Sequence, residues 1–134
     1  MSHAFTWDIR GRSPSGRAVI YKQYSKLFIP TKADALLAAE RDVDITRELI
    51  VVHPDPIVVI DVAGVKLTRN LSVFVKHCID CNMPRVAHIH VVNCPTWANA
   101  MYKMVKRILG SGSEPLASMH KCPYEGIQDS IHAI

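Results

Sequence analysis

Two continuous apolar runs, separated by an amphipathic helix pattern, constrain the fold of this chain most. The first run is residues 57–64, IVVIDVAG, and the second is residues 89–97, IHVVNCPTW. Strands rich in β-branched residues without polar alternation are typical of parallel sheets covered on both faces. Each run contains one polar side chain, Asp61 or Asn93, at the point where the strand should end. We therefore expect these side chains at one edge of an α/β sheet, where such folds keep their ligand crevice.

The rest of the sequence extends this pattern into alternating strands and helices. Residues 1–16 are polar and interrupted by glycine and proline, so they predict an irregular lead-in. Thr31 is a plausible N-cap for the long helix that follows Pro30. The order predicts a single α/β domain over residues 17–134, with a mostly parallel sheet flanked by helices. The expected elements are strands over 17–24, 57–64, 85–93 and 116–121, and helices over 32–53, 71–79, 95–109 and 124–134.

Size, hydropathy and charge argue against a membrane-spanning protein and a dedicated nucleic-acid binder. A chain of 134 residues can bury a core without disulfides or metal. It has no apolar run of the roughly 20 residues that a membrane span needs, and its first residues do not resemble a signal peptide. We expect a cytoplasmic protein. A net charge of +4 is too small for a dedicated nucleic-acid binder, but it permits loose attraction to anionic membranes.

Cysteine and histidine residues raise the question of a metal site. Cys78 and Cys81 have CxxC spacing, which would suit half a zinc site or a redox pair. We favour burial of Cys78 on the apolar face of a helix, because the chain has no second CxxC and buried cysteine is commonly a small hydrophobe. His88 and His90 would share one face of a strand. We expect His90 to be a hydrogen-bonded core residue, Asp61 and Asn93 to cap turns, and no metal or cofactor to bind; a metal or acid–base histidine pair is the alternative.

Several segments, in order, resemble the CRAL-TRIO lipid-binding domains, the family of retinaldehyde-, tocopherol- and phosphatidylinositol-transfer proteins. The family's fold is α/β, and the resemblance covers most of the chain from Gly16 onward. It implies non-covalent binding of a small hydrophobic ligand such as a phospholipid, a retinoid or a tocopherol-like molecule. The matching segments are Gly16-Arg17-Ala18-Val19, Ile60-Asp61-Val62-Ala63-Gly64, Pro84-Arg85, Ile89-His90-Val91-Val92-Asn93-Cys94-Pro95 and Val105-Lys106-Arg107-Ile108-Leu109.

The chain departs from the family in several places. We expect the family's N-terminal helical module and its extreme C-terminal segment to be missing. A Gly-Ser stretch at residues 110–114 replaces lysines that relatives use for phosphoinositides, so phosphoinositide-coupled transfer is not carried over. Ala18 and Arg107 stand where the family has proline.

The helix expected after Pro95 carries the predicted binding surface. Its apolar residues share one face at helical spacing, which also fits simple packing on a sheet. The resemblance implies that this helix gates a lipid cavity and that its basic residues meet membranes during exchange. The predicted ligand contacts are Ile60, Phe74, Trp97, Met101, Met104, Val105 and Ile108, and the predicted membrane contacts are Lys103, Lys106 and Arg107.

The sequence therefore predicts a carrier that transports or presents a hydrophobic ligand and touches membranes transiently. A ligand-free interaction or regulatory module built on a truncated CRAL-TRIO domain is the first alternative. An α/β enzyme is the second, and it is disfavoured because the chain has no GxGxxG, no GxxxxGK[ST] and no GxSxG motif. We expect no enzymatic activity. Oligomeric state does not follow from the sequence.

Overall fold

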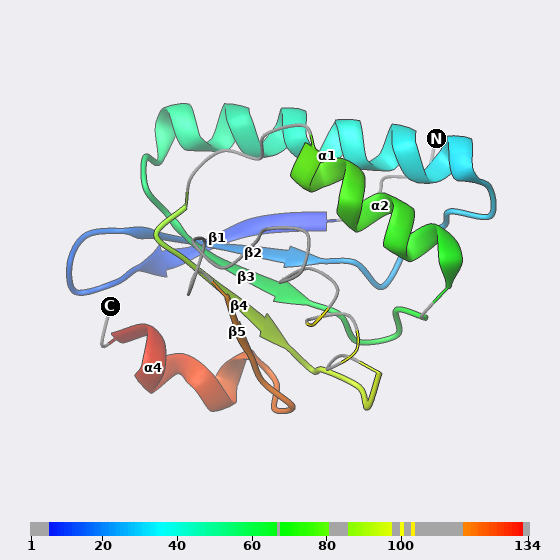
Figure 1. Ribbon diagram of the computed structural model, residues 1–134. Coiled ribbons are helices and arrows are strands. Elements are labelled where there is room, and N and C mark those ends of the chain that lie inside the picture. Colours follow the sequence, from blue (N-terminus) through cyan, green and yellow to red (C-terminus); the bar gives the residue numbers. More distant parts are fainter. Residues whose placement is uncertain are drawn as a thin grey trace.

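The computed structural model describes residues 6–66, 68–80, 86–97, 100, 103 and 117–132. These residues form an α/β domain in which helices cover a five-stranded sheet (Figure 1). In chain order the elements are β1 (Thr6–Arg12), β2 (Ala18–Gln23), α1 (Lys32–Val52), β3 (Ile57–Asp61), α2 (Arg69–Asp80), β4 (His88–Val92), β5 (Ala117–Met119), the 3-10 helix η2 (Tyr124–Ile127) and α4 (Gln128–His132).

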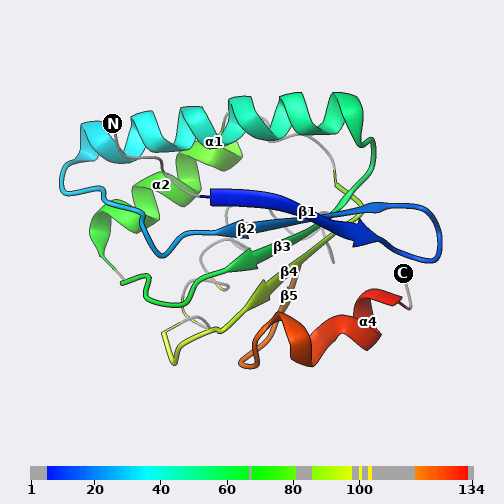
Figure 2. The same cartoon turned by 180° about the vertical axis from the view of Figure 1, so that it is seen from behind.

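The strand order is β1-β2-β3-β4-β5, and only the β1–β2 pair is antiparallel. The expected mostly parallel α/β sheet is therefore confirmed. Each parallel connection moves to the next position in the same direction, and right-handed crossovers then place their helices on one face. Accordingly, α1 and α2 lie together on one side of the sheet, whereas α4 lies on the other (Figures 1 and 2).

The expectation of an irregular lead-in over residues 1–16 is wrong for residues 6–12, which form β1. The glycine and proline residues that suggested a loop instead make the hairpin turn. Gly16 has a positive φ of 88° and donates its N–H to the carbonyl of Ser13, 2.8 Å away. Gly11, also at positive φ, accompanies a shift in the β1–β2 register between Ile9 and Arg12.

The long helix α1 ends one residue before the predicted C-terminus. The Thr31 side chain accepts a hydrogen bond from the Asp34 backbone N–H, which confirms the predicted N-cap. Helix α2 contains the predicted apolar stripe and packs against α1, with Cys78 buried in their interface. The Cys78 thiol faces the Ala39 carbonyl at 4.0 Å, so the apolar interpretation of this cysteine is confirmed. Cys81 lies outside the described residues.

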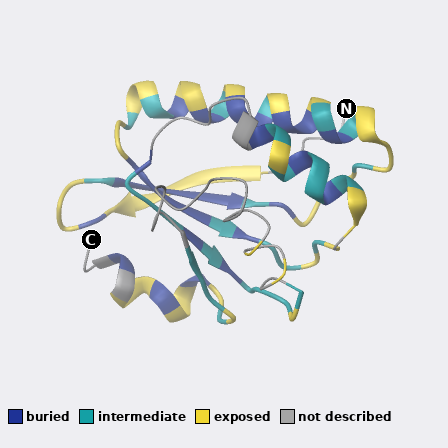
Figure 3. Cartoon of the chain, viewed as in Figure 1, coloured by how far each residue is buried: buried dark blue, intermediate teal, exposed yellow. Residues whose placement is uncertain are grey.

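The register divides the sheet into two faces. Ile20, Val58 and Ile89 lie on the side of α1, and we call this side the helix face. Tyr21, Val59 and Val92 lie on the other side, the opposite face, where η2 and α4 cover them. Along β2 and β3, residues of both faces are buried (Figure 3).

A buried ion pair fixes α1 to the helix face. Lys22 Nζ lies 2.9 Å from Asp42 Oδ1 and 2.6 Å from Thr46 Oγ1, and the Lys22 and Asp42 side chains are 3% and 2% exposed. Tyr24 donates its hydroxyl to the other Asp42 oxygen. Burial and the adjacent carboxylate raise the pKa of Tyr24 well above its ordinary value. Lys22 and Asp42 therefore form an ion pair that is almost completely shielded from solvent.

The remaining elements differ from prediction mainly at their ends. Strand β4 begins at His88 rather than residue 85, β5 is three residues long, and the last helix begins as a 3-10 turn. The helix expected over 95–109 lies mostly outside the described residues. Its predicted start is wrong, because residues 95–97 are not helical, whereas Ala100 and Lys103 are assigned as helical. Among the described helices, none is both long and apolar enough to cross a bilayer.

Candidate functional site

On the helix face, the apolar side chains from β3 to β5 are less buried than those beneath α1. Ile60 of β3 is level with Val91 of β4, and Val91 is level with Met119 of β5. Ile89 lies on the same face two residues before Val91. All four side chains are only half-buried, unlike Ile20 and Val58 beneath α1. We call Ile60, Ile89, Val91 and Met119 the apolar floor.

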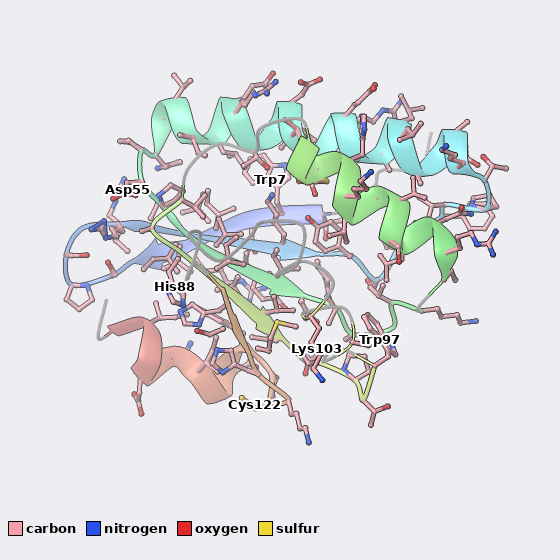
Figure 4. All side chains as sticks on the ribbon, in the orientation of Figure 1. Trp7, Asp55, His88, Trp97, Lys103 and Cys122 are labelled. Atoms are coloured by element: carbon pink, nitrogen blue, oxygen red, sulfur yellow. The ribbon has the colours of Figure 1, made fainter. Side chains whose placement is uncertain are left out.

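Two further predicted ligand contacts share a core cluster with Ile60 of the apolar floor. Trp97 follows the carboxyl end of β4 and packs, half-buried, against the α1–α2 core (Figure 4). Phe74 of α2 belongs to that core, is 5% exposed and makes an edge-on contact with Tyr24. Ile60 packs against the same cluster. The structure thus gathers Ile60, Phe74 and Trp97 around one core, although Phe74 keeps little surface for a ligand.

The other predicted contacts lie mostly outside the described residues. Lys103 is exposed, as a membrane-contacting residue must be. Nothing further is described for the side chains of Met101, Met104, Val105, Lys106, Arg107 and Ile108.

Sequence reasoning missed three residues of the apolar floor: Ile89, Val91 and Met119. A signal for two of them was present. Placing His88 and His90 on one face of a strand puts Ile89 and Val91 on the other. Met119 could not be found this way, because its position depends on the pairing of β4 with β5.

On the opposite face, Asp61 joins the carboxyl ends of three strands. Its Oδ1 accepts hydrogen bonds from the Ala63 backbone and from Asn93 Nδ2, each at 2.9 Å, and its Oδ2 accepts one from the Tyr21 hydroxyl. Burial alone would raise the pKa of Asp61, but these donors outweigh it and hold that pKa below its ordinary value. Burial and the same Asp61 bond raise the pKa of Tyr21.

The Asp61 network is therefore structural. The Ala63 contact closes a turn, which confirms the expected capping role of Asp61. Asn93 has a positive φ of 56°, a conformation that asparagine tolerates better than most residues, and its side chain donates to Asp61. Arg10 lies 3.8 Å from the centre of the Tyr21 ring and covers the network from β1.

Three histidines lie side by side on the opposite face. His90 Nδ1 is 3.0 Å from His120 Nε2, and His88 Nε2 is 2.9 Å from Ser118 Oγ. The His88 and His90 ring centres are 4.4 Å apart. His90 is 3% exposed, which confirms it as a hydrogen-bonded core residue. Burial, reinforced by its two histidine neighbours, lowers the pKa of His90 to about 4.

The His88 and His120 rings are tilted by 39° and 32° relative to the His90 ring. Among the described residues, no group of three or more His, Cys, Asp or Glu side chains is arranged to hold a metal ion. The described cysteines, Cys78, Cys94 and Cys122, are free thiols. This arrangement suits structural packing of neutral imidazoles, with His90 kept uncharged by burial.

The described residues also line a small depression along β1 and β2. Its volume is about 130 Å³, and Arg10, Tyr21 and Gln23 contribute to its wall. Pockets for drug-sized ligands measure roughly 300–1,000 Å³. This depression is too small for a lipid, so the apolar floor is the better candidate for a hydrophobic ligand.

Comparison with known proteins supports the fold. No family model matches this sequence, and no curated protein matches it. Among solved structures, the chain is similar to the crystal structure of Sfh5. The TM-score is 0.59 and the identity 15%, over 90% of this chain and 47% of the Sfh5 chain. The chain therefore spans about half the length of Sfh5, and the two proteins share a fold.

Proposed function

We propose that this protein binds a small hydrophobic ligand non-covalently on the apolar floor and transports or presents it inside the cell. The observation that carries the proposal is the in-register row of Ile60, Val91 and Met119, which three strands present half-buried on the helix face. The resemblance of the sequence to CRAL-TRIO lipid-binding domains and the likeness of the fold to Sfh5 support the same conclusion. The ligand classes we propose are phospholipid, retinoid or tocopherol-like molecules.

Burial of a hydrocarbon tail supplies enough free energy for tight binding, so the site needs no catalytic group. Burying one methylene group gains about 0.8 kcal/mol, so a tail of about sixteen carbons gains on the order of 13 kcal/mol before the costs of association. The floor itself offers only aliphatic and thioether groups, and methionine adapts its shape to a flexible chain. We propose that the protein is not an enzyme. The Asp61 and His90 side chains, which would be the natural acids or bases, are engaged on the opposite face.

We further propose that ligand exchange takes place during transient contact of this cytoplasmic protein with anionic membranes. Lys103 is exposed, and Lys106 and Arg107 follow it within one helical turn of sequence. Each basic residue near an anionic surface contributes about 1 kcal/mol of attraction. Cosedimentation with vesicles should therefore rise with the phosphatidylserine fraction and fall with added salt. Equal binding to neutral and anionic vesicles would contradict this part of the proposal.

Native mass spectrometry on freshly purified protein, followed by organic extraction, tests the carrier function directly. We expect a stoichiometric lipid or isoprenoid-like mass. A protein that is empty and also fails to take up fluorescent lipids would overturn the proposal. A ligand-free interaction module would then be the better account.

A substitution on the floor tests the location of the site. Val91→Trp fills the space above β4 and should abolish uptake of fluorescent lipid. Val51→Trp is the matched control, because Val51 is 84% exposed at the end of α1. Both variants should keep a cooperative thermal transition. Normal uptake by folded Val91→Trp would place the ligand elsewhere.

A further inference from the structure

The outer edge of β1 has the properties of an interaction surface. All seven residues of this strand are exposed, including Trp7 at 45% and Ile9 at 37% (Figure 3). In the described part of the chain, no strand pairs with the side of β1 that faces away from β2. Proteins usually protect such an edge with lysine, proline or a bulge. Residues 6–12 contain neither lysine nor proline, and the register shift begins only after Ile9.

The charges of β1 are arranged symmetrically about Ile9. Asp8 and Arg10 flank it on the same face of the sheet, and Arg10 Nε lies 3.2 Å from Asp8 Oδ1. If a second copy of the strand is turned antiparallel about Ile9, Asp8 of each copy lies opposite Arg10 of the other. Ile9 then meets Ile9, and Trp7 meets Gly11.

Other registers are disfavoured by the same charges. Centring the pair on Asp8 would place two carboxylates opposite each other, and centring it on Arg10 would oppose two guanidinium groups. A parallel, in-register pair would do both. Like charges directly opposite each other destabilise a strand pair, whereas opposite charges stabilise it. Of the antiparallel registers centred on Asp8, Ile9 and Arg10, only the one centred on Ile9 places opposite charges across the pair.

We propose that two copies of this protein associate through β1, in the antiparallel register centred on Ile9, to form one continuous sheet. The contact is isologous, since the same strand serves both copies. Trp7 and Ile9 of both copies then form one apolar row on the helix-face side. A Cβ at Gly11 would meet nothing within 4 Å, which leaves room for the opposing indole. Because one short strand supplies the contact, the dimer is weak and depends on concentration.

Sedimentation velocity from micromolar to millimolar protein tests the proposal. We expect the wild-type mass to rise from one to two chains. Asp8→Arg and Arg10→Asp should each remain monomeric, because like charges then face across the pair. An equimolar mixture of the two variants should dimerise, since each supplies the charge that the other needs. Asp44→Arg makes the same charge change on exposed α1 and should dimerise like the wild type.

Three results would overturn the proposal: a wild-type protein that stays monomeric, single variants that dimerise normally, or folded variants whose mixture does not associate. Hydrogen exchange on the wild type gives a second measurement that needs no substitution. Backbone amides of residues 6–10 should become better protected as concentration rises, whereas those of α1 should not change. Protection of β1 that is independent of concentration would also contradict the pairing.

Discussion

The two faces of the sheet are built from the same strands but differ in burial and in hydrogen bonding. On the opposite face, Asp61, His90 and Tyr21 are buried, and each has a hydrogen-bonding partner on another element. On the helix face, a buried ion pair closes the β2 side, whereas the apolar floor over β3–β5 is only half-buried. Buried polar groups thus stabilise the fold. The proposed ligand surface is the apolar floor, whose four side chains are all apolar. Four predictions test this division.

The largest effect is expected at the Lys22–Asp42 pair. Asp42→Asn leaves the Lys22 ammonium buried without its counter-charge, and removing one member of a buried ion pair costs roughly 3–5 kcal/mol of unfolding free energy. Urea unfolding measures this loss. The control is Asp55→Asn, which breaks an exposed pair with Arg17 at 2.8 Å and should cost less than about 1 kcal/mol. Equal losses in the two variants would show that α1 is not held by this pair.

The histidine cluster should make stability depend on pH. The pKa of His90 is lowered to about 4 in the folded protein, against an ordinary value of 6.5. The unfolded chain therefore binds more protons between these pH values, so the stabilisation is complete above pH 6.5 and is lost as the pH falls toward 4. Between pH 7 and pH 5 the unfolding free energy should fall by about 2 kcal/mol.

His90→Asn should flatten this pH dependence, because it removes the titrating ring. His77→Asn is the control, since His77 lies at the surface 3.4 Å from Glu40 and should leave the dependence in place. Burial also lowers the pKa of His88 and of His120, so a small slope should persist in His90→Asn. An unchanged slope in that variant would assign the effect to its neighbours.

A smaller loss is expected when Asp61 loses one donor. Tyr21→Phe keeps the ring beneath Arg10 but removes the hydroxyl bond, which should cost about 1.5 kcal/mol at pH 7 because the acceptor is charged. The lowered pKa of Asp61 gives stability above about pH 4 that is lost as the pH falls further, so the difference from wild type should shrink in acid. Tyr124→Phe keeps the Asp61 bonds and is the matched control in urea unfolding.

The sequence predicted the parts of the fold that depend on local signals. The Thr31 N-cap predicted α1, and the apolar stripe predicted α2. The runs of β-branched residues predicted β3 and β4. Strand β1 was missed because glycine and proline outweighed the alternation of Trp7 and Ile9. The apolar floor and the bond between His90 and His120 were only partly accessible, because they depend on which strands pair and in what register.

The smallest effect on stability is expected at Val91, and it gives the sharpest test of the two faces. Val91 and Val92 are consecutive in β4, but Val91 is half-buried on the apolar floor and Val92 is fully buried on the opposite face. Val91→Thr should change the unfolding free energy by about 0.5 kcal/mol or less, yet weaken uptake of fluorescent lipid, because it places a hydroxyl against the ligand. Val92→Thr should show the reverse, with normal uptake and a loss of about 1–3 kcal/mol from a hydroxyl buried among apolar groups. If both variants bind lipid normally, the ligand does not lie on β4, and the division of roles between the faces fails.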